Sequence, residues 1–145
     1  MLTFFSRIVV PYDGSELSKK ALETAIRLAK QDEGTELNVI TVVDQPTNMA
    51  FYATYNLDTL REANLSAAKE MLDEVEQKLK NLPNKTGTFI LEGSPAYEIV
   101  DFIKQDDADL VVMGSRGLSG LKELFLGSVS HYVVQKVTCQ VFIVK

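Results

Sequence analysis

Short apolar runs rich in β-branched residues alternate with longer amphipathic stretches along this chain of 145 residues. Such runs are typical of strands buried on both faces of a parallel sheet, and the stretches between them repeat apolar residues at helical spacing. Strands that alternate with helices imply right-handed crossovers. The sequence therefore predicts an α/β fold, a doubly wound parallel sheet of five strands with helices on both faces, in a single domain spanning residues 1–145. The predicted strands are 7–12, 37–43, 86–92, 109–113 and 140–145.

The predicted helices cover residues 16–33, 57–82, 95–105 and 128–137. The second ends before Pro83, because proline restricts the residue that precedes it. The third has Ser94 as its N-cap and Pro95 at its first position, where a missing N–H costs nothing. Residues 44–56 form a predicted loop. Whether its aromatic side chains Phe51, Tyr52 and Tyr55 cover a ligand, a dimer interface or the core stays open.

The composition excludes several classes of function. The formal net charge is −5 and the lysines are spread along solvated helix faces, which argues against a nucleic acid partner. No stretch approaches the roughly 18 uninterrupted apolar residues of a membrane span, and the amino terminus lacks the features of a signal peptide. We therefore expect no membrane insertion. The single cysteine, Cys139, cannot form an internal disulfide, so we expect a cytoplasmic protein.

Glycines gather after the fourth predicted strand. Four of the eight glycines in the chain lie there, namely Gly114, Gly117, Gly120 and Gly127. Glycine lets a backbone approach a ligand closely, and the exposed N–H groups of such a turn form a concave site for an anion. This segment therefore predicts a phosphate-binding loop. Neither the GxxxxGK pattern followed by Ser or Thr nor GxGxxG after the first strand is present, so the loop is neither an ordinary P-loop nor a common dinucleotide motif.

The start of the last predicted helix is a second phosphate-binding feature. The N–H groups and dipole at a helix N-terminus favour an anion, and the Ser128 and Ser130 hydroxyls are further candidate donors. The alternative is that the glycines only make turns and that Ser128 only caps the helix. Because the glycine loop and the helix start follow each other directly, we favour phosphate binding.

The spacing Gly114-x2-Gly117-x9-Gly127-Ser128 matches the ATP-binding pattern of the universal stress protein family, and the chain resembles that family over essentially its whole length. Residues 9–22 (VVPYDGSELSKKAL) resemble the family's first strand and helix, and residues 41–44 (TVVD) resemble the end of its second strand. The resemblance implies the strand order 3-2-1-4-5 of a Rossmann-like, adenine nucleotide alpha hydrolase-like fold. The end of strand one and the loop after strand four would then face one cleft, which agrees with the rule that ligands bind where the winding of such a sheet reverses.

The resemblance also implies a set of nucleotide-binding residues. In that reading Pro11, Tyr12, Asp13 and Val42 surround adenine and ribose, Met113, Gly114, Arg116 and Gly117 follow the phosphates, and Gly127, Ser128, Val129 and Ser130 close on them.

Several side chains have more than one reading. Asp13 suits a ribose hydroxyl or a divalent cation, and equally a cap for the turn into the first helix. Arg116 suits contact with phosphate more than a purely solvated position. His131 is read as a surface residue, since no serine and carboxylate are visibly arranged around it. Cys139 is read as a small hydrophobe rather than a reactive thiol.

Together these observations predict an ATP-binding protein of the stress-response type, with magnesium held through the phosphates. We expect no enzymatic activity beyond weak hydrolysis, because the motif offers no base and lysine set beside Asp13 and Arg116. The alternative is a nucleotide-independent dimeric interaction module. A phosphoacceptor receiver is disfavoured, because the chain lacks an aspartate after strand three. The last strand, from Gln140 to Lys145, would lie at a sheet edge and is expected to form a homodimer.

Overall fold

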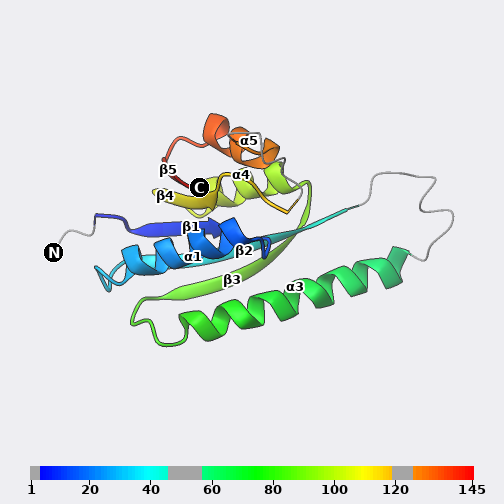
Figure 1. The fold of residues 1–145 in the computed structure, drawn as a ribbon, viewed down its shortest axis with the longest axis horizontal. Coiled ribbons are helices and arrows are strands. Elements are labelled where there is room, and N and C mark those ends of the chain that lie inside the picture. The colour runs from blue at the N-terminus through cyan, green and yellow to red at the C-terminus, as the bar shows by residue number, and fades with distance from the viewer. Residues whose placement is uncertain (1–3, 46–56, 119–125) are drawn as a thin grey trace.

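The computed structural model describes residues 4–45, 57–118 and 126–145. Its centre is a five-stranded sheet in the order β3-β2-β1-β4-β5, in which every neighbouring pair runs parallel (Figure 1). The predicted α/β class and the order 3-2-1-4-5 are thereby confirmed. The strands are β1 (Arg7–Pro11), β2 (Glu36–Asp44), β3 (Thr86–Gly93), β4 (Leu110–Gly114) and β5 (Gln140–Val144), and the helices are α1 (Glu16–Ala29), α3 (Leu57–Leu79), α4 (Pro95–Gln105) and α5 (Ser128–Lys136).

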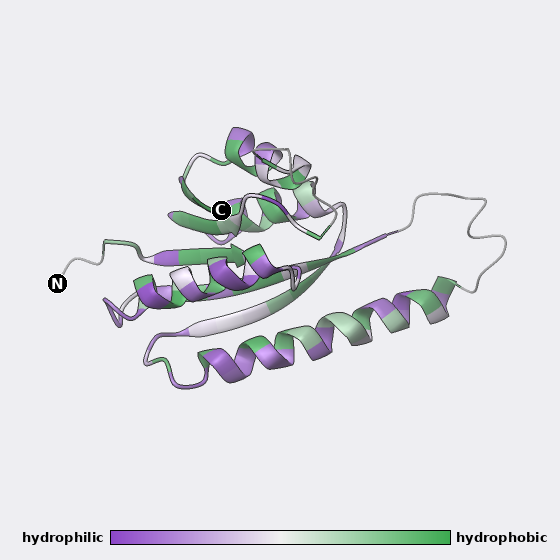
Figure 2. Ribbon diagram, in the orientation of Figure 1, coloured by the Kyte–Doolittle hydropathy of each residue, from purple (hydrophilic) through white to green (hydrophobic). Residues whose placement is uncertain are grey.

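The helices cover the sheet in two layers, with α1 and α3 on one face and α4 and α5 on the other. Residues of β1 alternate between the two cores: Ile8 and Val10 pack toward α1 and α3, while Val9 packs toward α4 and α5. All three side chains are fully buried. Apart from Arg7 at the start of β1, the central strands β1 and β4 are accordingly mostly hydrophobic, whereas β3 at the edge is paler (Figure 2).

Helix α1 shows how the local sequence sets an element's limits. It begins where the Ser15 hydroxyl oxygen accepts the Ser18 N–H at 3.2 Å. It ends at Ala29, earlier than the predicted limit before Gly34. The reason is tertiary: the Asn84 side-chain amide donates to the carbonyls of Ala29, Asp32 and Thr35 at 2.8–2.9 Å. These bonds hold the chain in a turn directly after the helix.

The other predicted bounds differ from the observed ones by a few residues at most. Helix α4 has the predicted limits, and Ser94 is its N-cap residue but forms no side-chain capping hydrogen bond. Gly93, in the turn before it, has a φ of 143°, which favours glycine. Gly127, rather than Ser128, is the N-cap residue of α5. Gly120 and the aromatic residues predicted in the loop at 44–56 lie outside the described residues. In the described parts of the chain, no helix is both long and apolar enough to cross a membrane.

Candidate functional site

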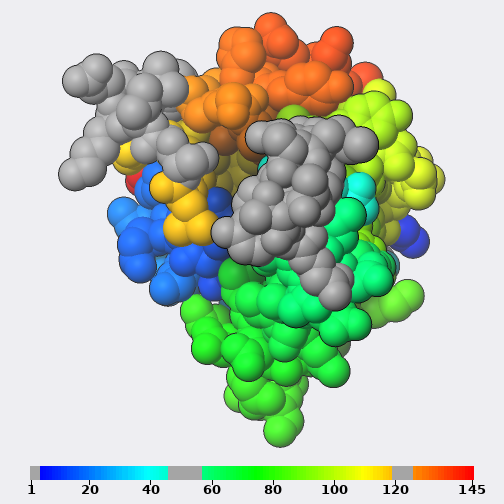
Figure 3. Space-filling view, turned by 90° about the vertical axis from the view of Figure 1, so that its right-hand side faces the viewer, coloured from blue at the N-terminus to red at the C-terminus, as the bar shows by residue number. Residues whose placement is uncertain are grey.

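A cavity of about 430 Å³ opens at the carboxyl edge of the sheet, next to the point between β1 and β4 where the winding reverses. Figure 3 looks onto this edge, where the yellow atoms of the loop after β4 lie between the blue atoms around the β1–α1 turn and the orange atoms of α5. Open α/β sheets bind ligands at this position, because the loops diverge there. The volume lies within the usual range of small-molecule sites.

Every residue that the sequence placed at the ligand lines this cavity. These residues are Pro11, Tyr12, Asp13, Val42, Met113, Gly114, Arg116, Gly117, Gly127, Ser128, Val129 and Ser130. Six further lining residues were not predicted, namely Ser18, Ile40, Thr41, Pro95, Ile99 and Leu118. The fold brings α4 over the end of β2, and this juxtaposition adds Pro95 and Ile99; no local motif in the sequence signals it.

One wall of the cavity is apolar. Ile40, Val42, Ile99 and Met113 all belong to the core that packs against α4 and α5, and each lines the cavity. A wall of this kind suits a flat, weakly polar group such as an aromatic base.

Tyr12 lines the same cavity, but its side chain packs in the opposite core with α1 and α3. Its backbone N–H donates to the Ile40 carbonyl at 2.8 Å. Burial raises the pKa of the Tyr12 phenol, so this group stays neutral at physiological pH. The Tyr12 ring thus packs with α1 and α3 while the residue still lines the cavity, and its place beside adenine or ribose stays a prediction.

Residues at the starts of α1, α4 and α5 reach the cavity. The first turn of α4 holds Pro95, which has no N–H, and the acidic Glu98. The N-terminus of α1 is already capped. The Asp13 carboxylate accepts the Ser15 N–H at 2.9 Å, and the Ser15 hydroxyl accepts the Ser18 N–H at 3.2 Å. Glu16 adds a negative charge to the first turn. The Ser15 cap thus satisfies one N–H of the first turn, and the negative charges of Asp13 and Glu16 repel a further anion. The capping role considered for Asp13 is therefore observed.

The N-terminus of α5 differs in each of these respects. Gly127 provides no side-chain cap, and no acidic residue lies in the first turn. The residues of this turn line the cavity. Its backbone N–H groups and the helix dipole therefore remain available to a negatively charged group.

The two serines near this N-terminus have different roles. Ser130 is buried, and its hydroxyl donates to the Gly114 carbonyl at 2.9 Å. The expectation that Ser130 offers its hydroxyl to a ligand is therefore corrected: this hydrogen bond instead ties α5 to the end of β4. Ser128 is exposed at the first position of α5 and retains its hydroxyl donor for a ligand.

Arg116 brings positive charge to the cavity. Within the described ranges its guanidinium forms no hydrogen bond or ion pair, whereas Arg7 and Arg61 each pair with an acidic side chain. Asp13 is the acidic residue among the described lining residues. An unpaired guanidinium beside an uncapped helix N-terminus is a suitable environment for phosphate oxygens.

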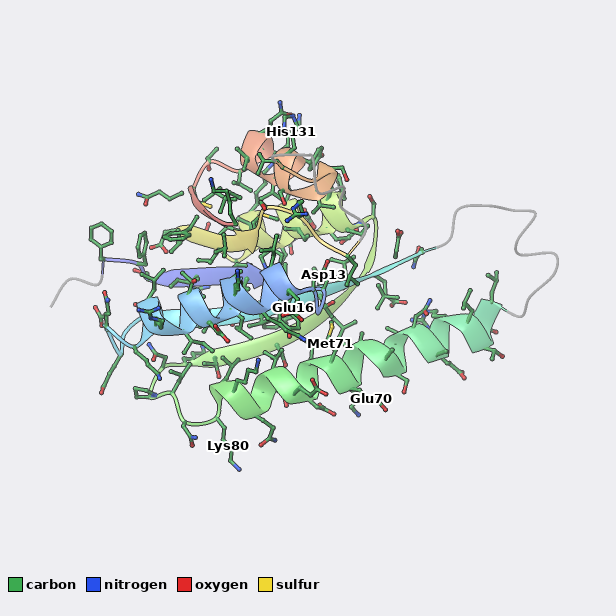
Figure 4. All side chains as sticks on the ribbon, viewed as in Figure 1. Asp13, Glu16, Glu70, Met71, Lys80 and His131 are labelled. Carbon is green, nitrogen blue, oxygen red and sulfur yellow. The ribbon has the colours of Figure 1, made fainter. Side chains whose placement is uncertain are left out.

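The remaining candidate groups lie away from this chemistry. His131 is exposed and points outward from α5, away from the sheet, as predicted (Figure 4). Cys139 is partly buried, and burial raises the pKa of its thiol, which suits the predicted apolar role. Among the residues described, no three histidine, cysteine, aspartate or glutamate side chains are grouped closely enough to hold a metal ion.

The fold and the cavity place the chain among doubly wound α/β proteins with a ligand cavity at the reversal point. A model of the universal stress protein family matches residues 4–145, and the chain belongs to that family. It is 35% identical over 148 residues to the universal stress protein YxiE of Bacillus subtilis, covering 97% of this chain and 99% of that protein. The structure of universal stress protein UspA from Lactobacillus plantarum superposes with a TM-score of 0.84 at 28% identity, covering 97% of each chain.

Two more distant structures share the fold and carry a nucleotide. One is a universal stress protein in complex with cAMP, with a TM-score of 0.73 at 24% identity and coverage of 97% of each chain. The other is a universal stress protein family protein from Arabidopsis thaliana with AMP bound, with a TM-score of 0.72 at 19% identity and coverage of 97% of this chain and 91% of that one.

Proposed function

We propose that this chain binds ATP or a closely related adenine nucleotide in the cavity at the carboxyl edge of the sheet. The observation that carries the proposal is the uncapped N-terminus of α5, which lines the cavity beside Arg116, whose guanidinium has no partner among the described residues. The apolar wall formed by Ile40, Val42 and Ile99 lies in the same cavity and suits the base. The nucleotides in the two distant relatives, cAMP and AMP, support the class of ligand.

The residues present fit a magnesium nucleotide. The Ser128 hydroxyl, the first-turn N–H groups of α5 and Arg116 would hold the phosphates. Magnesium is commonly bound through one or two carboxylates together with substrate phosphates. In the part of the chain that the structure describes, Asp13 is the carboxylate at the cavity, so magnesium would be held chiefly by the phosphates.

The proposal includes no efficient catalysis. Hydrolysis of a phosphoanhydride needs a positioned water, a base and a cationic clamp. Both oxygens of Asp13 already accept backbone N–H groups, and His131 points away from the sheet. The rate at which the purified protein releases phosphate from ATP should therefore stay close to the background rate. Turnover well above background that disappears in the Asp13→Ala variant would contradict this.

We further propose a cytoplasmic homodimer that forms through β5, the strand predicted from Gln140 to Lys145. β5 lies at the edge of the sheet, and Phe142 on it is 46% exposed. An apolar edge strand favours pairing with a second copy. Sedimentation at micromolar concentration should show a dimer that Phe142→Glu dissociates; a monomeric parent protein would exclude this assembly.

Titration calorimetry tests the function directly. The protein is stripped of nucleotide and titrated with ATP and magnesium, beside a Gly127→Val variant. Among the described residues beyond its chain neighbours, a methyl group added at Gly127 would meet the Arg116 Cα and the Ser115 carbonyl oxygen, each at 3.5 Å, which is ordinary contact. Gly127→Ala therefore serves as a folding control. Binding by the parent and not by Gly127→Val supports the proposal, whereas binding by neither protein favours the nucleotide-independent interaction module.

A further inference from the structure

The Asp13 carboxylate joins two loops that are far apart in the sequence. Its Oδ1 accepts the Ser15 N–H at 2.9 Å within the β1–α1 turn. Its Oδ2 accepts the Leu118 N–H at 3.1 Å, across 105 residues, from the loop after β4. Hydrogen bonds to an ionised acceptor are stronger than those between neutral groups. One side chain thus connects the two loops that flank the reversal point of the sheet.

Gly117 shows how closely the loop approaches this carboxylate. A Cβ atom added there would lie 2.5 Å from Asp13 Oδ2; beyond the chain neighbours, the only other atom of the described residues within 4 Å is Asp13 Cγ at 3.6 Å. The φ of Gly117 lies outside the left-handed region, so this angle alone does not require glycine. The need for glycine at this position therefore arises from Asp13 and not from backbone strain.

The turn that carries Asp13 is itself supported from the other side. Gly14 has a φ of 81°, and a Cβ atom added to it would lie 3.0 Å from Met71 Sδ on α3. Figure 4 shows Met71 directed from α3 toward the start of α1, where Asp13 lies. The turn that carries the Asp13 carboxylate therefore packs against Met71 of α3.

We propose that Asp13 is a positioning residue that clamps the loop after β4 against the β1–α1 turn and so sets where Arg116 and Gly117 border the cavity. The clamp is a property of the nucleotide-free protein. Its consequence for affinity rests on the proposed nucleotide binding, because a loop fixed in its binding conformation loses less entropy when a ligand binds.

Amide hydrogen exchange tests the clamp without any nucleotide. In the parent protein the Leu118 amide should be protected, and in Asp13→Ala its protection should fall about tenfold, as expected for the loss of one charge-assisted bond. The Gly127 amide, which donates to the Ser115 carbonyl at 2.6 Å, is the internal control and should keep its protection. Asp13→Asn retains one acceptor oxygen and should deprotect either the Ser15 or the Leu118 amide.

A double-mutant cycle then tests whether Asp13 is the reason for glycine at position 117. Gly117→Ala should lower Leu118 protection about tenfold in the parent protein and should have no further effect in Asp13→Ala, where the obstructing oxygen is gone. Unprotected exchange of Leu118 in the parent, or an equal effect of Gly117→Ala in both backgrounds, overturns the clamp.

Titration with ATP and magnesium completes the test. If the clamp sets the phosphate loop, Asp13→Ala and Gly117→Ala should each raise the Kd about tenfold, and the double variant should be no weaker than Asp13→Ala alone. If the parent binds no ATP while Leu118 remains protected by Asp13, the proposed function fails and the clamp stands. If ATP binds equally well to the parent and to Asp13→Ala, the positioning role is wrong.

Discussion

Placing a negative charge at the start of α5 should change stability and binding in opposite directions. Ser128 is exposed at the first helical position, and the first turn has no acidic residue. An aspartate there interacts favourably with the helix dipole, worth about 0.3–1 kcal/mol. For a chain of this length that corresponds to a rise in Tm of about 1–3 °C. Ser128→Asp should therefore fold at least as stably as the parent protein.

The same substitution should strongly weaken nucleotide binding. A carboxylate about 5 Å from a phosphate charge, in surroundings with an effective dielectric constant of about 20, is repelled by about 3 kcal/mol. This repulsion corresponds to a rise in Kd of about two orders of magnitude. Salt screens part of it, so the difference should narrow as ionic strength increases.

Two measurements on one preparation separate the effects. Differential scanning fluorimetry gives Tm, and titration calorimetry with ATP and magnesium gives Kd. Ser128→Asn is the matched control, because asparagine has the size of aspartate without its charge, and its Kd should rise far less than that of Ser128→Asp. Tight ATP binding by Ser128→Asp would refute the placement of phosphates at α5. A fall in Tm together with a fall in affinity would refute the reasoning about the uncapped helix.

Three further predictions concern the rest of the chain. Leu22→Ala, at a fully buried position in the core beneath α1, should lower the free energy of unfolding by about 2–5 kcal/mol, measured by urea denaturation with an unchanged m-value. The Arg61 guanidinium donates to the Glu92 carboxylate at 2.7 and 3.0 Å, and this hydrogen bonding lowers the pKa of Glu92 in the folded protein. The pair should therefore stabilise the fold at pH values above the pKa of Glu92 in the unfolded chain. This stabilisation should be lost as the pH falls through the lower pKa of Glu92 in the folded protein. An NMR titration of Glu92 in Arg61→Gln should show its pKa rising toward the ordinary value, and an unchanged pKa would contradict the pairing. Because burial raises the pKa of Cys139, iodoacetamide at pH 8 should alkylate it more slowly than an unstructured peptide thiol, and an equal rate would show that the thiol is accessible.

Much of the fold could be predicted from the sequence, because hydrophobic period and turn residues act locally. The apolar run at 7–12 predicted β1, and the proline at position 95 predicted the start of α4; both elements are found there. The end of α1 could not be predicted in this way. It depends on Asn84, whose amide reaches Ala29, Asp32 and Thr35 across about 50 residues of chain, and nothing near residue 30 reveals that contact.

The candidate site was predictable where a motif and the topology coincide. Gly127 and Ser128 follow directly from the glycine spacing, and the cavity includes both. The Tyr12 side chain packs in the same core as Ile8 and Val10, which the alternation of strand residues implies and the glycine motif does not. The sequence could not show that Ser130 donates to Gly114, because the two residues meet only when α5 packs beside β4.

The glycine pattern itself combines three separate physical requirements. A Cβ atom on Gly114 would lie 2.8 Å from Leu17 Cβ, so that glycine lets α1 pack against β4. Gly117 is required by the Asp13 carboxylate, whereas Gly127 has room for a methyl group within the protein. Of these three positions, only 127 has no contact among the described residues that requires glycine. We therefore infer that glycine at position 127 serves the close approach of a ligand. It follows that a relative lacking Asp13 is free to lose Gly117 and still bind nucleotide, whereas one that replaces Gly127 with a bulky residue should fold and not bind.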